Sequence, residues 1–356
     1  MLLVCGLASA LSGCGGSGDA GSGHRHPSLS HQPQLFLVSS DGGRVRQLTR
    51  RARWHGSPSW SRDGRRLAYP TGCGLEVIRR DGSRKRALLR RDRRCPSVVS
   101  WSPQGDLIAF AALAEDPGPS SVETVKPSGS DHRQIDRFHD ERGVDDEEQP
   151  AWAPNGERIV YSRFISVPVP RGEVVSPRRA KLVSARADGR GRRQITAGAH
   201  FDSSPSWSPN GRGIAFVRVG DRALLRLLVV DARGGAPRLV LDDLVELSNP
   251  AWSPSGRQIA FSGVTTSGDR RYYLYVVDLR GRRRRLTGEV TSAPAWSPDG
   301  KRIAYADYVG RVRVVAPDGS DERTLTKLPG AEISGLSWSP DGGRLAFTAQ
   351  KRPPED

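Results

Sequence analysis

A tryptophan-centred phrase recurs seven times in this 356-residue chain. Each copy is close to Ala-Trp-Ser-Pro-Asp-Gly, followed three residues later by an apolar triplet ending in Phe or Tyr. Successive tryptophans are 41 to 55 residues apart, and they are Trp60, Trp101, Trp152, Trp207, Trp252, Trp296 and Trp338. A repeat period in the forties, built from strand-like pieces, is typical of sheets stacked radially around an axis. This repeat constrains the fold more than any other feature of the chain.

Each repeat predicts four strands. In the sixth copy, Pro298 presets φ and Asp299-Gly300 closes a tight turn, and the next strand, 302–306, is nearly all apolar. A second hairpin follows, clearest at 272–278 and 283–287 in the preceding repeat. The other second hairpins carry Asp-Gly, Ser-Gly or Gly-Gly turns. The pattern predicts β-propeller blades made of four antiparallel strands.

The two ends of the chain complement each other in this pattern. The chain opens with an isolated second hairpin at 35–49 and ends with an isolated first hairpin at 337–348. Joined, they make one blade, which seals the ring. The sequence therefore predicts an all-β, seven-bladed β-propeller over residues 35–349, with the last blade closed by both termini. The alternative is two or more separate β domains.

The N-terminal segment suggests export. Residues 2–11 form an apolar stretch too short to span a membrane. The four residues Leu11-Ser12-Gly13-Cys14 resemble a bacterial lipobox, which implies a lipid on Cys14 and the membrane as a partner. No Lys or Arg precedes the stretch, so a start further upstream, an ordinary cleaved signal and a chance match stay open. We expect residues 1–14 to be a lipoprotein-type signal ending at Cys14, residues 15–34 to be a flexible linker and residues 350–356 to be a disordered tail.

The formal net charge is +16, and much of the excess lies in the predicted fourth strands and the turns before them. Arginine there suits an outer edge that must not pair with other sheets. It also suits attraction to an anionic surface such as phospholipid headgroups, and a further alternative function is binding of an anionic wall polymer or carbohydrate. Nucleic acid is not expected, because no basic strip is interleaved with aromatic residues and the leader points outside the cytoplasm.

Two further cysteines lie in loops on the same predicted face. Cys73 follows the second strand of one blade, and Cys95 lies in the loop leading into the next. We predict a structural disulfide between Cys73 and Cys95, with two free thiols as the alternative.

The repeat W-S-P-D-G with its following D-G turn and R-x-L-T ending resembles the TolB-type propeller repeat, also called the WD40-like PD40 repeat. The resemblance covers about nine-tenths of the chain. It implies a propeller in the cell envelope that binds a protein or peptide partner. TolB itself has six blades and an extra α/β domain, for which this chain has no room, so the partner's identity is not implied. The same repeat forms the non-catalytic propeller of prolyl-oligopeptidase-like peptidases.

The sequence carries no catalytic motif of a common hydrolase, metalloprotease, nucleotide-binding or redox class. We therefore expect no enzyme activity and no cofactor. The candidates for a binding face are the predicted loop residues Trp54, His55, Asp146, Glu147, His200 and Asp202.

Three of these candidates, His55, Glu147 and Asp202, each stand five residues before a repeat tryptophan. Such a set around the channel mouth would suit a metal, and the alternative function is a metal-assisted lyase or hydrolase. Six acidic residues in 140–148 would hold Ca²⁺, receive a cationic partner or simply be solvated. The longest inserted loop, 164–179, is a further candidate for a protein or peptide site.

Overall fold

The computed structural model describes residues 32–50, 56–72, 74–89, 94–114, 119–139, 150–165, 179–220, 223–267 and 271–352. In these ranges the regular elements are strands, which confirms the predicted all-β class. None of the described residues forms a helix long and apolar enough to cross a membrane.

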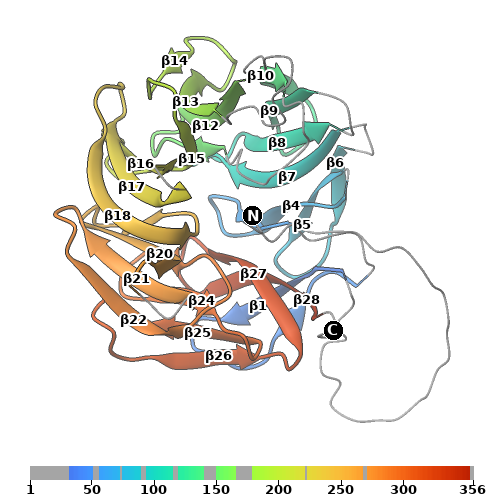
Figure 1. The fold of residues 1–356 in the computed structure, drawn as a ribbon. Coiled ribbons are helices and arrows are strands. Elements are labelled where there is room, and N and C mark those ends of the chain that lie inside the picture. The colour runs from blue at the N-terminus through green and yellow to red at the C-terminus, as the bar shows by residue number, and fades with distance from the viewer. Residues whose placement is uncertain are drawn as a thin grey trace, which may run out of the picture.

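The strands alternate along the chain with short turns and longer loops (Figure 1). In chain order they are β1 (Gln34–Ser39), β2 (Arg46–Gln47), β3 (Ser59–Trp60), β4 (Arg66–Pro70), β5 (Leu75–Arg79), β6 (Arg86–Leu89), β7 (Arg94–Trp101), β8 (Ile108–Ala114), β9 (Pro119–Val125), β10 (Arg133–His139), β11 (Ala151–Trp152), β12 (Arg158–Ile165), β13 (Arg179–Arg186), β14 (Arg193–Gln194), β15 (Phe201–Trp207), β16 (Gly213–Val219), β17 (Leu225–Asp231), β18 (Arg238–Leu247), β19 (Ala251–Trp252), β20 (Gln258–Thr265), β21 (Tyr273–Asp278), β22 (Arg283–Glu289), β23 (Ala295–Trp296), β24 (Ile303–Ala306), β25 (Arg311–Val315), β26 (Arg323–Lys327), β27 (Ala331–Trp338) and β28 (Arg344–Lys351).

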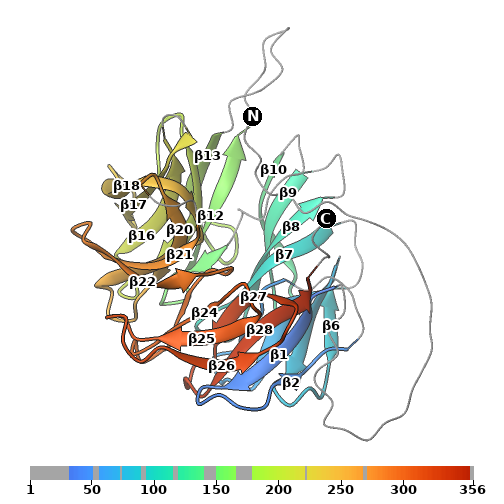
Figure 2. The same ribbon diagram turned by 60° about the horizontal axis from the view of Figure 1, so that its bottom comes forward.

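Four sheets have four strands each, in the orders β3-β4-β5-β6, β10-β9-β8-β7, β23-β24-β25-β26 and β2-β1-β28-β27. The last of these combines both ends of the chain. Strand β1 pairs antiparallel with β28, from Gln34 opposite Ala349 to Ser39 opposite Arg344. The two strands lie side by side in both views of the ribbon (Figures 1 and 2).

The remaining strands form one 12-stranded sheet, where the sequence predicted separate four-stranded blades. Two extra pairings join the groups. Strand β13 pairs in parallel with β15 through Ala180 and Phe201, and β18 pairs with β20 from Leu244 to Leu247. The second pairing exists because β18 has 10 residues and extends past its partner β17 into the connection with the next group.

The recurring Ser-Pro-Asp-Gly phrase forms a turn in which the side chains bind the backbone. The Ser297 hydroxyl donates to Asp299 Oδ1 at 2.6 Å and accepts from the backbone N–H of Arg302 at 3.0 Å. The Lys301 N–H donates to the same carboxylate oxygen at 3.0 Å. Gly300 has φ 69°, which L side chains rarely adopt. The phrase recurs because each of its residues satisfies a different requirement of one turn.

The tryptophans tie each repeat to the one before it. Six of the seven donate their indole N–H to the backbone carbonyl of the residue that precedes the tryptophan of the neighbouring repeat, at 2.9 to 3.1 Å. The pairs are Trp60 with Ser337, Trp152 with Ser100, Trp207 with Ala151, Trp252 with Ser206, Trp296 with Ala251 and Trp338 with Ala295. Trp101 differs: its indole donates to Gly105 O at 3.2 Å, and its backbone N–H donates to Ser59 Oγ at 2.8 Å.

The strands that carry these tryptophans contact one another in chain order. They are β3, β7, β11, β15, β19, β23 and β27, and β27 in turn contacts β3. Buried apolar clusters lie between neighbouring sheets, for example around Phe36, Phe347 and Trp338. Burying one such side chain stabilises the fold by about 1.5–3 kcal/mol. A strand covered on both faces needs apolar side chains on both, which explains the apolar runs of the middle strands.

An aromatic ring stands nine residues after each tryptophan and is at most 1% exposed. The seven rings are Tyr69, Phe110, Tyr161, Phe216, Phe261, Tyr305 and Phe347. Each of the three tyrosine hydroxyls donates to a carboxylate: Glu76 at 2.8 Å, Asp136 at 2.9 Å and Glu322. Burial is the largest cause that raises the pKa of each tyrosine, so all three hydroxyls stay protonated donors.

Candidate functional site

Because the strands of each repeat are antiparallel, the connections between them lie at two opposite ends of the sheet. These two ends define two faces of the molecule, the turn face and the loop face. The turn face carries the turns between the first and second strands and between the third and fourth strands, such as 297–302 and 316–322. The loop face carries the loops that lead into each repeat and those that join its second and third strands, such as 290–294 and 307–310. The sequence predicted the binding site on the loop face.

Most of the predicted site lies outside the described residues. This applies to Trp54, His55, Asp146 and Glu147, to the acidic segment 140–148 and to 166–178 of the longest insertion. It applies also to Cys14 and Cys73. Their predicted roles therefore stay predictions. Cys95 is the second residue of strand β7, and it is disulfide-bonded.

The structure separates the two predicted site residues that it does describe. His200 directly precedes β15 and is exposed, whereas Asp202 lies within β15 and is 1% exposed. Arg218 of β16 lies directly opposite Asp202, and its Nε and Nη2 atoms donate to the two carboxylate oxygens at 2.6 and 2.9 Å. The guanidinium also lies 5.5 Å from the centre of the Phe216 ring. Both oxygens of Asp202 are thus engaged by a buried arginine.

A metal centre needs several ligands close together. Among the described residues no three His, Cys, Asp or Glu side chains are grouped so that they could hold a metal ion. Only Asp202 of the predicted metal ligands lies among the described residues; the other two, His55 and Glu147, lie outside them.

The loop face has a pocket of about 470 Å³ near the C-terminal repeats. Serine hydroxyls organise its wall: Ser248 Oγ accepts from Ser262 N–H at 2.8 Å, and Ser262 Oγ donates to Ser292 O at 2.7 Å. The Thr291 hydroxyl is buried without a hydrogen-bond partner in the described part of the chain. The pocket wall is therefore polar and internally hydrogen-bonded, and the Thr291 hydroxyl lies buried behind it rather than free in the pocket.

An exposed hydrophobic pair stands beside this pocket. Tyr308 lines it and is 47% exposed, and the adjacent Val309 is 52% exposed. Arg352 donates a hydrogen bond to the backbone carbonyl of Tyr308, and Asp307 Oδ1 accepts from Val309 N–H at 3.1 Å. Hydrogen bonds to the backbone of both residues therefore hold the loop in place.

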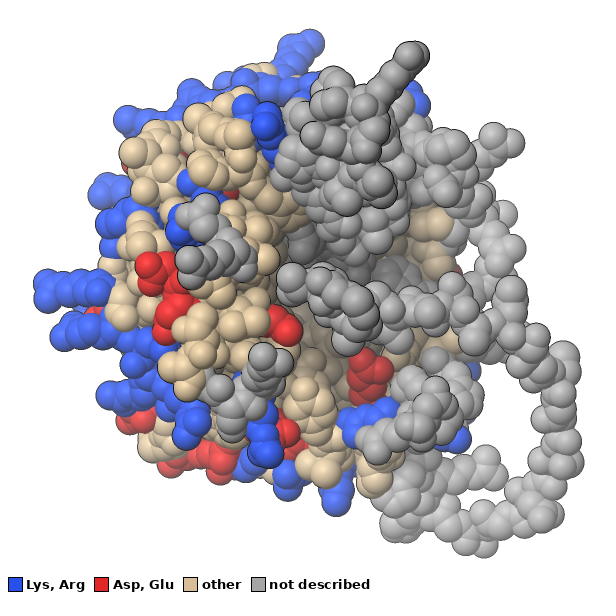
Figure 3. Space-filling view, viewed as in Figure 1, with Lys and Arg blue, Asp and Glu red and all other residues tan. Residues whose placement is uncertain are grey.

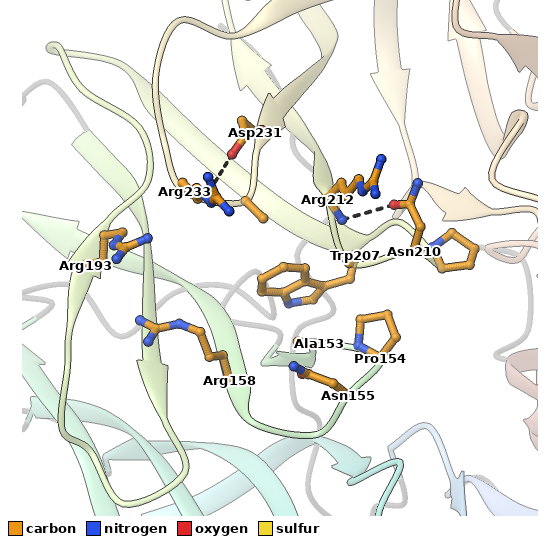
Figure 4. A pocket seen from close by; sticks show the side chains of 13 residues that line it. Ala153, Pro154, Asn155, Arg158, Arg193, Trp207, Asn210, Arg212, Asp231 and Arg233 are labelled. Atoms are coloured by element: carbon orange, nitrogen blue, oxygen red, sulfur yellow. Dashed lines mark hydrogen bonds between the residues drawn. The ribbon is translucent and has the colours of Figure 1, made fainter.

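The turn face has a larger pocket, of about 610 Å³, between the third and fourth repeats. Figure 4 shows four arginines around it: Arg158, Arg193 and Arg233 lie to the left of the Trp207 ring in this view, and Arg212 lies above the ring. The sequence predicts the arginine-rich turns on this face, although the binding site was expected on the other face. The run at 190–193 was the signal that pointed to the turn face.

The charge distribution agrees with the predicted position of the arginines. In Figure 3, Lys and Arg side chains are prominent along the outer rim of the disc-shaped molecule. Outer strands such as β22 (RRRLTGE) and β14 (RQ) carry part of this charge. The rim is therefore a poor partner for another sheet edge, as the sequence predicted.

Comparison with known proteins identifies the repeats. Residues 214–353 match the TolB beta propeller domain family. A putative TolB from Agrobacterium tumefaciens is similar in structure, with 18% identity and a TM-score of 0.54 over 90% of this chain and 98% of that one. TolB from Acinetobacter baumannii has 14% identity and a TM-score of 0.53, over 92% of this chain and 66% of that one.

An enzyme has a similar fold. An oligogalacturonate lyase in complex with manganese has 13% identity and a TM-score of 0.64, over 92% of this chain and 99% of that chain. At such identities the likeness shows the fold alone. A search of curated protein sequences finds no match. The predicted resemblance to TolB-type propeller repeats is thus confirmed, and the same fold occurs in TolB proteins and in a lyase.

Proposed function

We propose that this chain, which carries TolB-type propeller repeats, is a lipid-anchored protein of the cell envelope that binds another envelope protein through its loop face. The lipid would be on Cys14, outside the cytoplasm, as the lipobox-like segment suggests. Its propeller would have seven blades in a closed ring. The contact of β27 with β3, the Trp60–Ser337 hydrogen bond and the β1–β28 pairing support that closure.

The observation that carries the binding proposal is the exposed pair Tyr308 and Val309 beside the loop-face pocket. Exposed aromatic side chains on a rigid support are frequent anchors of protein interfaces, and such an anchor contributes about 2 kcal/mol or more. The hydrogen bonds from Arg352 and to Asp307 hold the loop before a partner arrives. Less conformational entropy is then lost on binding.

The test is capture of envelope proteins from detergent-solubilised membranes by the immobilised protein, followed by mass spectrometry. We expect one partner to be retained by the wild type and lost by the double variant Tyr308→Ala/Val309→Ala. The matched control is Leu239→Ala, which removes a side chain of similar exposure, 47%, on strand β18. An identical set of captured proteins from the wild type and the double variant would refute this contact surface.

The anchor is tested separately in cells by metabolic labelling with a palmitate analogue. We expect the label on the wild type and its loss in Cys14→Ser, together with release of the variant from the membrane fraction. A labelled Cys14→Ser variant would refute lipidation at this residue.

The enzymatic alternative would need a metal at the mouth of the channel on the loop face. The purified protein should then retain a transition metal at one equivalent after dialysis, and replacing His55 or Glu147 should release it. That result would replace the binding proposal with a lyase or hydrolase function.

A further inference from the structure

We propose that the turn-face pocket between the third and fourth repeats is a second binding site, and that its ligand is an anionic oligosaccharide. This site is distinct from the loop-face contact proposed above, and nothing in the binding of a protein partner requires it. The proposal follows from the charge of the pocket, the hydrogen-bonding character of its lining and the aromatic ring at its centre.

The charge of the pocket is strongly unbalanced. Four arginines line it, Arg158, Arg193, Arg212 and Arg233, against one carboxylate, that of Asp231. No salt bridge involves any of the four among the described residues, although other arginines of the chain, such as Arg218, are paired. Guanidinium groups left without carboxylates attract carboxylate or phosphate groups from a ligand.

Arg158 is held in place without an anionic partner. Its Nη2 donates to Ser184 Oγ at 2.9 Å and to Gly191 O at 2.7 Å, and its Nε donates to Ser184 Oγ at 3.2 Å. Burial, followed by repulsion from Arg193 and Arg186, lowers the pKa of Arg158. All these hydrogen-bond partners are neutral, so the charge stays available. A fixed guanidinium loses little freedom when it binds an anion.

The side chains of the lining offer donors and few acceptors. Asn155 Oδ1 already accepts from Glu157 N–H at 3.1 Å, and Asn210 Oδ1 accepts from Arg212 N–H at 3.0 Å. Asp231 Oδ1 accepts from Arg233 N–H at 2.8 Å, as Figure 4 shows. A peptide brings one N–H donor per residue, for which these side chains provide few acceptors. A carboxylated or phosphorylated sugar brings mostly acceptors, which fits the lining better.

Trp207 supplies the third element of the site. Its indole N–H is occupied by Ala151 O at 3.0 Å, so the ring is fixed and offers only its carbon surface to the pocket (Figure 4). A flat, partly exposed aromatic ring next to hydrogen-bond donors suits a sugar ring, which stacks on it while its charged groups contact the arginines.

The experiment uses the purified full chain and isothermal titration calorimetry with four probes of matched length. They are an oligouronate, a phosphate-substituted oligosaccharide, a neutral oligosaccharide and an oligoglutamate peptide. We expect one or both anionic sugars to bind, with an affinity that falls as salt is raised, and the neutral sugar not to bind. Whichever anionic sugar binds more tightly identifies the charged group.

Two variants link the binding to the pocket. Arg193→Gln/Arg233→Gln should weaken binding of the anionic sugar by tenfold or more. The control is Arg257→Gln, at the exposed position of the next repeat that corresponds to Arg212, and it should stay within twofold of wild type. The proposal is overturned if neither anionic sugar binds, if the oligoglutamate binds as tightly as they do, or if the pocket and control variants weaken binding equally. Loss of the Tyr308 contact would leave these results unchanged, so the two proposals fail independently.

Discussion

Replacing the carboxylate of Asp202 is expected to destabilise the fold severely. In Asp202→Asn, the charge of Arg218 would remain in a site where its side chain is only 10% exposed. Removing one partner of a buried ion pair costs about 3–5 kcal/mol, because the remaining charge keeps its desolvation penalty without its counter-ion. The asparagine amide oxygen can still accept one hydrogen bond from the guanidinium, which places the loss near the lower end of this range; the contact with the Phe216 ring, 5.5 Å away, is present in both proteins and cancels. We therefore expect a net loss of about 3 kcal/mol, more than a hundredfold in the ratio of folded to unfolded protein.

The assay is urea-induced unfolding followed by tryptophan fluorescence. The double variant Asp202→Leu/Arg218→Met should recover most of the loss, because apolar side chains of similar size often replace a buried ion pair at little cost. The matched surface control is Glu289→Gln, whose partner Arg271 is 60% exposed and which should cost less than about 1 kcal/mol.

A stability of Asp202→Asn within about 0.5 kcal/mol of wild type would refute this reasoning. If that stable variant also lost a bound metal, Asp202 would be a ligand, as the alternative function requires.

Three further outcomes are expected. The Ser297 hydroxyl, and next the Lys301 N–H, lower the pKa of Asp299 below its ordinary 3.8. The ionised carboxylate therefore stabilises the fold above about pH 4, and this contribution is lost as the pH falls further. In urea unfolding, the free energy of unfolding should fall less between pH 6 and pH 3 in Asp299→Asn than in the wild type. Tyr161→Phe should cost about 1–2 kcal/mol, since the ring still fits and only the hydrogen bond to Asp136 is lost; an unchanged unfolding midpoint would contradict it. Cys95→Ser should lose about 2–4 kcal/mol and become insensitive to reductant, whereas equal reductant effects on both proteins would show that the disulfide does not stabilise the fold.

The strands and turns of this chain could be predicted from sequence because each depends on neighbouring residues. The Ser-Pro-Asp-Gly turn binds its own side chains to its own backbone, and the same backbone turn closes all seven copies, including the third, where Ala153 replaces the serine. The role of the tryptophans was not predicted, because each indole binds a carbonyl in another repeat, as Trp60 does with Ser337.

The Asp202–Arg218 pair shows why the candidate site was harder to predict. Continuing the register from Ser206 opposite Ala215 would place Asp202 opposite Val219. A bulge between Ser203 and Ser206 shifts the pairing by one residue, so that Arg218 lies opposite Asp202 instead. Pro205 in this stretch is compatible with a bulge, but it does not fix where the register shifts, and a shift of one residue changes which side chains meet. The turn-face pocket depends in the same way on which turns become neighbours in space.

The sheet made of β2, β1, β28 and β27 can form only after nearly all the repeats have been synthesised. Among the described strands, β1 is the first to be synthesised and its partner β28 the last. Until then, one edge of β1 has no mate and remains open to the wrong strand or to another chain. A premature stop anywhere before β28 would leave that edge of β1 without its partner, so correct pairing at the beginning of the propeller depends on synthesis of nearly all the repeats.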